Sequence, residues 1–367
     1  MKKKKGLLGY SIIIAIVFIC FIMIISSDSN NIDYLAKHQG LKITNVFNIK
    51  KDLKNLDPHL TIELEDDGYD IYVPSGRGYR YGPSIIYYED GTMDAWFAAN
   101  GSGGVWDYIT YRHFDGENWG DEEVVLKPTR NSNDHYSVCD PGVIYFNDYY
   151  YIGYTSTLNS TGGGVENCGY VARSKNPNGP FEKWSGDHWG DNPQPIIIYD
   201  ENDGEWGAGE ISFVVKDDRL YCYYSWINKT ENCMRLMISD LSENWPANLI
   251  EKGTVLKKGG SEDSCDVVYN DEYERFVALS MEYRFTDYAS IAIYESNDGT
   301  AFTRIDSVDR HVENYAHNLG ISKMPNGHIG LDDNLIIGYA YSKTNRNIWG
   351  VWSTILQSTK IKLVNGK

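Results

Sequence analysis

Short runs of apolar and aromatic residues, separated by turns rich in glycine, asparagine and aspartate, make up the chain from about residue 61 onward. These runs include SIIYYE, DAWFAA, YYYIGYTST, LYCYYSW and RFVALSM. Runs of this length and composition are typical of β-strands, and many of them at even spacing indicate a sandwich, a barrel or a propeller. No helical period of useful length accompanies them. We therefore expect an all-β fold over residues 61–367.

An internal repeat distinguishes among these architectures. Each copy opens on a small or acidic residue that leads into an apolar strand, and a turn that carries an aromatic residue follows the first four openings. A Tyr-rich strand lies between these two features. Because four strands fit one such period, five periods predict a five-bladed β-propeller. Either residues 60–75 or the strands near 349–356 would close the ring. The openings are at Gly82, Asp140, Glu210, Asp266 and Asn318.

The N-terminal segment departs from this pattern. Lys2 to Lys5 are all basic, and residues 6–26 carry no charge. About 20 apolar residues span a bilayer as a helix, and lysines that precede the span stay in the cytoplasm. We therefore expect residues 1–27 to form a basic tip and a transmembrane signal anchor, and residues 28–60 a stalk. The protein would be single-pass in the cell membrane with the propeller outside the cytoplasm. A cleaved signal peptide is the alternative, although no small-x-small cleavage pattern follows the apolar run.

Composition excludes some classes of protein. With 42% hydrophobic and 23% charged residues, the body is expected to be globular. The net charge of -17 opposes binding to phosphates, so no nucleic acid partner is expected. The 29 tyrosines and 10 tryptophans suit strands, and they also offer flat faces for sugar rings. Five of the six cysteines follow the apolar run without the spacing of a zinc site, and we expect buried thiols.

Carboxylates among the repeat openings supply the candidate chemistry. The innermost strands of a propeller begin at one mouth of its channel, so Asp140, Glu210 and Asp266 would face one another there. Carboxylates gathered in a concave site raise the pKa of their neighbours, and one can stay protonated while another is ionised. Hydrolysis of a glycosidic bond needs such a set, because an acid protonates the leaving oxygen while a base activates water.

The blade openings and the run WGAGEISFVVKDDRLYCYYSW resemble the five-bladed glycosidases of glycoside hydrolase family 43 and its relatives, over about residues 76–355. The resemblance implies that Asp140 in CDPG tunes the pKa of the acid and that Glu210 in GAGEIS is the general acid. It also implies a general base at the first opening, where the family has Asp before Pro and this chain has Gly82. An inverting hydrolase of arabinofuranosides, xylosides or galactosides in a polysaccharide is implied, acting without a required cofactor.

The absence of an acid at Gly82 leaves two interpretations open. In the first, another carboxylate supplies the base, with Asp266 as the main candidate and Asp263 and Asp107 as further ones. In the second, the propeller has lost catalysis and only binds glycan. A sialidase propeller, suggested by the Asp-box-like turn SNDGTAF, usually has six blades, so the five periods count against it.

Several other residues are expected to contact the substrate, which would be an oligo- or polysaccharide bound by a monomer. An indole four residues before the acid can stack on a sugar ring, and an arginine two residues before Gly82 can orient a hydroxyl. In family 43 a histidine of the last blade often lies on the axis near a calcium ion or a water cluster, so calcium is an option there. The predicted substrate-binding residues are Arg80, Trp206, His317, His135 and Asp107.

Overall fold

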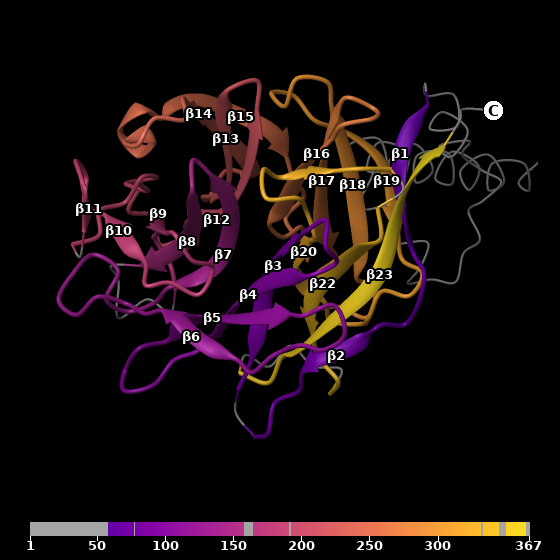
Figure 1. Cartoon of the computed structure of the whole chain (residues 1–367), viewed down its shortest axis with the longest axis horizontal. Coiled ribbons are helices and arrows are strands. Elements are labelled where there is room, and N and C mark those ends of the chain that lie inside the picture. Colours follow the sequence, from indigo (N-terminus) through magenta and orange to yellow (C-terminus); the bar gives the residue numbers. More distant parts are fainter. Residues whose placement is uncertain are drawn as a thin grey trace, which may run out of the picture. The chain divides into compact units, whose positions relative to one another are not determined.

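Strands dominate the structure, as the sequence pattern predicts (Figure 1). The computed structural model describes residues 58–76, 78–157, 164–190, 192–331, 333–344 and 350–364. Within these ranges the only assigned helix is a short 3-10 helix, η2, at Trp245–Asn248. The all-β expectation is therefore confirmed for the described part of the chain.

Antiparallel pairing of consecutive strands builds the sheets. The first sheet contains β3 (Arg80–Tyr87), β4 (Met93–Asn100), β5 (Asp107–Phe114) and β6 (Glu123–Leu126). The second has nine strands in two antiparallel groups, which a single parallel pairing of Gly207 with Asn167 joins. Its first group contains β7 (Cys139–Phe146), β8 (Tyr149–Thr157), β9 (Asn167–Ser174), β10 (Glu182–Trp184) and β11 (Trp189–Gly190). Its second group contains β12 (Gly207–Lys216), β13 (Arg219–Ile227), β14 (Asn232–Ser239) and β15 (Ile250–Lys257).

Two further sheets complete the described residues. The third contains β16 (Cys265–Asn270), β17 (Arg275–Glu282), β18 (Ser290–Ser296), β19 (Thr303–Val308) and β21 (His328–Ile329). The fourth contains β20 (His317–Ile321), β22 (Leu335–Tyr341), β23 (Ser353–Val364), β1 (His59–Leu64) and β2 (Tyr69–Tyr72). Both β1 and β2 pair antiparallel with β23, so the two segments that we expected to compete for closing the ring share the last sheet (Figure 1).

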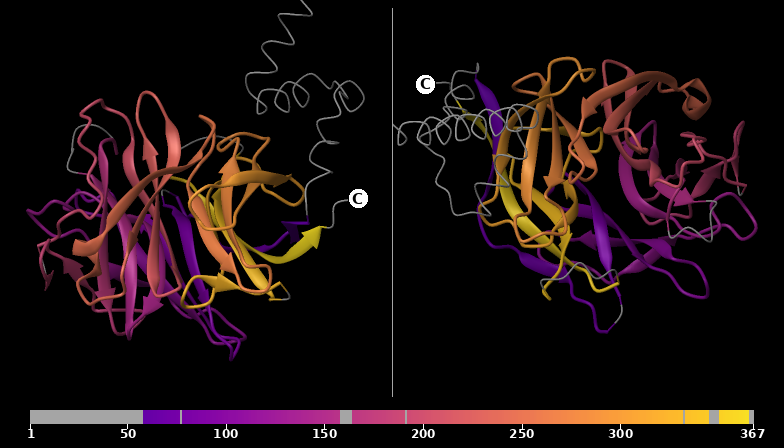
Figure 2. Two further views of the ribbon diagram at one scale, coloured as in Figure 1. Left: turned by 90° about the horizontal axis from the view of Figure 1, so that it is seen from above. Right: turned by 180° about the vertical axis from the view of Figure 1, so that it is seen from behind.

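The first strand of each group lies innermost. β3, β7, β12, β16 and β20 contact one another in this order, and β20 returns to β3 (Figures 1 and 2). Two inner crossings are so close that only glycine fits: a Cβ on Gly142 would lie 1.7 Å from the carbonyl oxygen of Ile211, and one on Gly320 would lie 1.8 Å from that of Pro83. The five inner strands therefore bring residues from distant parts of the sequence to one place.

Burial on both faces explains the continuous apolar runs of the sequence. All six residues of β16 and all eight of β9 are buried. Side chains alternate between the two faces of a strand, so a strand with packed neighbours on both faces needs apolar or satisfied polar residues throughout. The cysteines follow the same logic, since the five in the described residues are buried thiols, as expected.

The membrane assignment requires a correction. No helix in the described ranges is long and apolar enough to cross a bilayer. A span needs about 20 apolar residues in a helix, whereas η2 has four. The expectation of a single-pass cell-membrane protein with its propeller outside the cytoplasm is therefore not supported. The segments behind it, the tip and span at 1–27 and the stalk up to residue 57, lie outside the described residues.

Candidate active site

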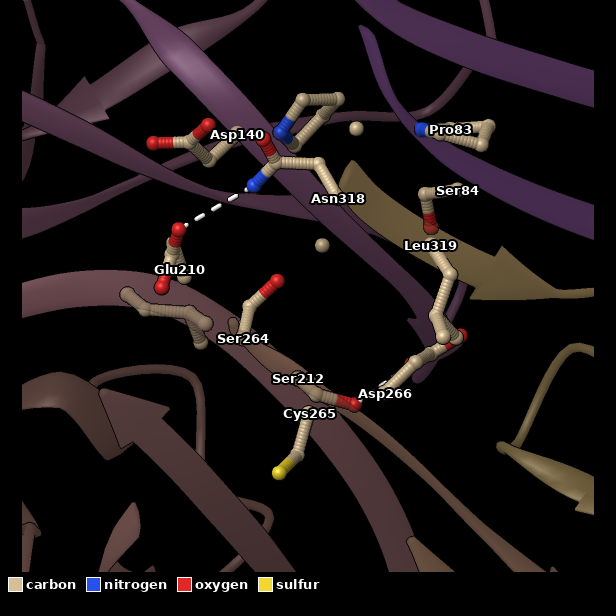
Figure 3. Close-up of a pocket in the computed structure, with 14 residues that line it drawn as sticks. Pro83, Ser84, Asp140, Glu210, Ser212, Ser264, Cys265, Asp266, Asn318 and Leu319 are labelled. Carbon is tan, nitrogen blue, oxygen red and sulfur yellow. Dashed lines mark hydrogen bonds between the residues drawn. The ribbon is translucent and has the colours of Figure 1, made fainter. Parts of the chain in front are cut away.

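Four inner strands share an unusual backbone conformation at the place where the repeat opens. Gly82, Asp140, Glu210 and Asn318 have φ angles of 56°, 51°, 50° and 47°. The pairing register of each strand with its neighbour shifts at this residue and the one that follows it. Such β-bulges redirect the side chain and are frequent beside functional sites. Here they line one cavity of about 30 Å3, which has room for one or two water molecules (Figure 3).

The fifth inner strand, β16, pairs with β17 without a register shift. Its alignment with the others follows from two equivalent hydrogen bonds. The Ser84 hydroxyl accepts a hydrogen bond from the N–H of Val143 at 3.0 Å, and the Ser212 hydroxyl accepts one from the N–H of Val267 at 3.0 Å. Val267 in β16 therefore takes the place of Val143 in β7.

This alignment corrects the expected position of Asp266. In β7 both Asp140 and Pro141 stand between the paired residues Cys139 and Gly142, whereas the unbulged β16 has one residue, Cys265, at this place. Asp266 therefore aligns with Gly142, and it lies one residue beyond the ring position of β16. The sequence repeat alone missed this offset because β16 lacks the extra residue that bulges the other four strands.

Asp266 is held by partners of its own. Its Oδ1 lies 2.6 Å from the ammonium group of Lys323 and accepts a hydrogen bond from the Ser212 hydroxyl at 2.8 Å. Its Oδ2 accepts from the N–H of Ile321 at 3.0 Å. Both Asp266 and Lys323 are buried. A carboxylate that is paired and hydrogen-bonded in this way links three inner strands.

Asp140 and Glu210 form the carboxyl pair at the mouth, where both are partly exposed (Figure 3). Burial and the charge of Glu210 raise the pKa of Asp140 well above its usual range. Burial and the charge of Asp263 raise the pKa of Glu210, although Lys258 and Arg284 act against them. Because each ionised neighbour disfavours ionisation of the next, the pair retains a proton at a pH where isolated carboxyls have lost theirs.

Polar groups from two other strands orient Glu210. Its Oε1 accepts a hydrogen bond from Nδ2 of Asn318 at 3.1 Å, and its backbone N–H donates to the Thr155 hydroxyl at 2.8 Å. The backbone N–H of Asn318 in turn donates to Asp263 at 2.8 Å. Glu210 is therefore tied to its surroundings from β8 and β20.

Sequence reasoning missed two cations of this site. Arg284, in the loop after β17, pairs with Asp263 at 2.7 Å. Lys258 is buried and donates to the Ser225 hydroxyl at 3.1 Å and to the carbonyl oxygen of Asp263 at 2.7 Å. Burial raises the pKa of Asp263, but the charge of Arg284, the hydrogen bond from the N–H of Asn318 and other neighbouring groups together outweigh it, and the net shift is downward. Neither cation lies in a repeated motif, so only the position of Glu210 in the repeat could have directed attention to its neighbours.

Asp107, the first residue of β5, is a further carboxyl near the mouth. It accepts hydrogen bonds from the hydroxyl groups of Tyr79 at 2.6 Å and Ser137 at 2.7 Å. Burial raises its pKa to about 6, against the opposite effect of the two hydroxyls. Asp107 forms a β-bridge with Ser137, three residues before Asp140, and its charge contributes to the raised pKa of Asp140.

His317 lies beside the ring position of β20 and is fully buried. Its Nδ1 is 2.6 Å from the side-chain oxygen of Asn318, and its ring packs against Tyr81, Phe285 and Trp352. Burial lowers the pKa of His317 to about 4, which keeps the imidazole neutral at pH 7. In the ranges that the structure describes, no group of three or more His, Cys, Asp or Glu residues could hold a metal ion. The calcium option stays a prediction.

Arg80 has structural partners. Its guanidinium donates to Glu122 at 2.7 Å and to Asn100 at 3.1 Å, and it stacks on the Tyr72 ring at 4.4 Å from the ring centre. In the structure Arg80 forms a salt bridge with Glu122, and its contact with a sugar hydroxyl stays a prediction.

The predicted aromatic contacts lie in the segments that lead into β12 and β7. Trp206 is half-buried and directly precedes β12. The His135 ring packs on Tyr136 with ring centres 3.6 Å apart, and Tyr136 stacks on Trp106 at 5.9 Å. All three rings of this row are half-buried, and Trp106 immediately precedes Asp107.

Comparison with known proteins gives the class of fold. No protein-family profile and no curated protein matches the sequence. Solved structures do match, among them a family 117 glycoside hydrolase from the marine bacterium Zobellia galactanivorans (TM-score 0.59, 14% identity, 84% of this chain and 91% of that chain). An α-L-arabinofuranosidase from Podospora anserina matches with TM-score 0.59 and 11% identity, over 82% of this chain and 96% of that one. An endo-arabinase from Bacteroides thetaiotaomicron matches with TM-score 0.50 and 15% identity, over 82% and 98%. At these identities the likeness shows a propeller-like fold that glycoside hydrolases also have.

Proposed function

We propose that this protein is a glycoside hydrolase with a five-bladed β-propeller, similar to those of family 43, that acts as a monomer on a polysaccharide. The observation that carries the proposal is the Asp140–Glu210 pair, two partly exposed carboxyls in one cavity whose pKa values are both raised. The ring of five inner strands and the glycoside hydrolases among the similar structures support it.

In the proposed reaction Glu210 is the general acid. It donates its proton to the oxygen of the leaving group as the glycosidic bond breaks. Until then the nearby Asp140 disfavours loss of the proton from Glu210. Asn318 orients the acid through its amide. The cavity of about 30 Å3 is too small for a sugar ring, so in this proposal the ring lies above it, where Trp206 is the expected contact.

We propose Asp107 as the general base. Asp266 is neutralised by Lys323, and Asp263 is engaged by Arg284 and by the N–H of Asn318. Asp107 instead accepts hydrogen bonds from two neutral hydroxyls, and a pKa of about 6 suits a base that works near neutral pH. It would take a proton from water as the water attacks the anomeric carbon, with inversion of configuration.

The substrate class follows from what the similar structures are named for. They are an α-L-arabinofuranosidase and an endo-arabinase, and we propose arabinofuranoside-containing polysaccharides as the first class to test. Xylosides and galactosides are the next members of the panel.

The test is sugar release by the full chain from aryl glycosides and polysaccharides of these classes. Glu210→Gln should abolish release, whereas Glu205→Gln, a matched change in the loop before β12, should leave it unchanged. Proton NMR of the first product anomer should show inversion. Equal activity in Glu210→Gln and wild type would remove Glu210 from the mechanism.

A second candidate is a propeller that binds glycan without cleaving it, and Gly82 is the observation that favours it. Its Cα faces the cavity where a third carboxylate would complete the ring. Saturable binding of a polysaccharide with no product after long incubation would support this candidate over the enzyme.

A further inference from the structure

A second cavity lies at the end of the inner strands opposite to the candidate active site. β12 begins near Glu210 at the mouth and ends at Lys216, which lines this cavity. Its volume is about 430 Å3, much larger than the cavity on the axis. We call it the foot cavity. Its lining consists of Lys216, Asp217, Tyr221, Tyr269, Glu274, Arg275, Phe276, Asn297 and Asp298.

The foot cavity is built between two neighbouring groups of strands. The turn from β12 to β13 contributes Asp217, the turn before β17 contributes Glu274, and the turn after β18 contributes Asn297. β12 and β13 both contact β16, so the strands that carry these turns are packed together. The cavity is therefore supported by regular strands on both sides.

Aromatic rings form its floor. Tyr221 is half-buried and packs on Phe276 with ring centres 5.0 Å apart, and Phe276 meets the Tyr269 ring edge-on at 5.0 Å. The ammonium group of Lys216 lies 4.6 Å from the centre of the Tyr269 ring. Tyr221 is the ring that combines a fixed position with partial exposure, as a platform for a ligand requires.

Polar groups of both kinds surround these rings. The turn SNDGTAF, which resembles an Asp-box, sets one wall: Asp298 accepts hydrogen bonds from the N–H and the hydroxyl of Thr300, each at 2.8 Å. Asn297, beside it, is exposed. Lys216 and Arg275 are donors, three carboxylates are acceptors, and the amide of Asn297 is both.

From this lining we propose that the foot cavity is a second carbohydrate-binding site, which takes a segment of a neutral oligosaccharide. A ligand of one charge would require a lining of the opposite charge, whereas this one mixes two cations with three carboxylates. Sugar hydroxyls both donate and accept, and the faces of sugar rings pack on aromatic rings, so the mixture matches a saccharide. The ligand class rests on the proposed function, and the site would hold one part of a polysaccharide away from the mouth.

Calorimetry on the full-length Glu210→Gln protein would test this proposal, with xylohexaose and α-1,5-linked arabinohexaose as the probes. We expect at least one probe to bind at two sites. Asn297→Ala and Tyr221→Leu should each weaken one of the two binding events at least about tenfold, and Trp206→Ala should weaken the other. Arg219→Ala, a change at the start of β13 outside the cavity, should weaken neither.

The outcomes separate this site from the mouth. In the otherwise wild-type protein, Asn297→Ala should leave turnover of a small aryl glycoside unchanged, because such a substrate occupies the mouth alone. Binding isotherms that neither Asn297→Ala nor Tyr221→Leu alters would overturn the proposal, as would the absence of binding by both probes. Asn297 is exposed, so its variant tests the site even if Tyr221→Leu impairs folding. A different result would refute the proposed hydrolase and still support this site. In that case the wild-type protein releases no sugar, while Asn297→Ala or Tyr221→Leu abolishes one of the two binding events.

Discussion

The side-chain amide of Asn318 donates a hydrogen bond to Oε1 of Glu210 at 3.1 Å. A donor at this position favours the ionised carboxylate, so it opposes the burial and the negative charge that raise the pKa of Glu210. The pKa of the proposed acid therefore depends on two opposing effects: burial and negative charge around Glu210 raise it, and the hydrogen bond from Asn318 lowers it.

Removing this donor should shift the pH dependence of the reaction. In Asn318→Ala the pKa of Glu210 rises further, so the proposed acid stays protonated to higher pH. The alkaline limb of the plot of kcat/KM against pH should shift to higher pH. Asn318→Asp should shift it further, because it adds a second negative charge beside Glu210. Asn178→Ala, which removes an amide–carboxylate contact with Glu123 far from the mouth, is the control. A limb that stays in place in both Asn318 variants would show that Glu210 does not set it.

Gly82 can accept a carboxylate. Its φ of 56° matches the 51° of Asp140, and an added Cβ would lie 3.6 Å from the Asp140 Cα, an ordinary contact. We expect Gly82→Asp to fold with a loss of about 1 to 3 kcal/mol in the free energy of unfolding, since a residue with a Cβ is strained at this φ although aspartate adopts it more readily than most. In the Asp107→Asn background it should restore part of the lost turnover, whereas Gly82→Asn, of the same shape, should not. Equal turnover in the two variants would contradict a base at this position.

Because Asp107 is buried, replacing it with a neutral residue should stabilise the protein by an amount that depends on pH. The pKa of Asp107 is about 6 in the folded protein and near 3.8 when exposed. Between these values the folded state keeps a proton that the unfolded state loses, so this residue's contribution to stability falls as pH rises from about 4 to 6. Asp107→Asn removes that loss. Its free energy of unfolding relative to wild type should rise by up to about 3 kcal/mol over this range and then level off.

Urea unfolding at pH 4, 5, 6 and 7 measures this difference. Asp115→Asn, a change in an exposed turn carboxylate, is the control and should lack a rise in that window. A pH-independent difference for Asp107→Asn would mean that the carboxyl is ionised throughout.

The buried pair of Lys323 with Asp266 should matter for folding rather than for turnover. Lys323→Met leaves a buried carboxylate without its cation and should lower the free energy of unfolding by about 3 to 5 kcal/mol. Adding Asp266→Asn should recover part of this loss. Lys343→Met, which breaks the exposed pair with Asp70, should cost less than about 1 kcal/mol. If Asp266→Asn alone abolished turnover while the protein stayed folded, Asp266 would be part of the chemistry.

The fold was accessible from the sequence because its determinants are local. Apolar runs such as SFVV in β12 and VVY in β16 are long enough for strands, too short for helices, and repeat along the chain. The same repeat placed Asp140 and Glu210 at equivalent positions, so their meeting at one mouth followed from the topology. The closure of the ring was not predicted from the sequence. β1 and β2 both pair with β23, and the pattern along the chain does not show which segments from its two ends pair with each other.

The environment of the site could not be obtained in this way. Cys265 rather than Asp266 holds the fifth ring position because β16 lacks the bulge of the other inner strands, and a bulge is set by the pairing of two strands in space. The partners Lys323 and Arg284 come from segments that no motif distinguishes.

By itself the sequence determined the strand content, the repeat and the carboxyls at the openings of β7 and β12, since these depend on side-chain type and spacing along one chain. The tertiary structure decided which carboxyls are neutralised, which retain a proton and which residue fills each ring position. The physical reason is that pKa values and strand register depend on burial and on charges a few ångströms away in space, and those neighbours lie on other strands.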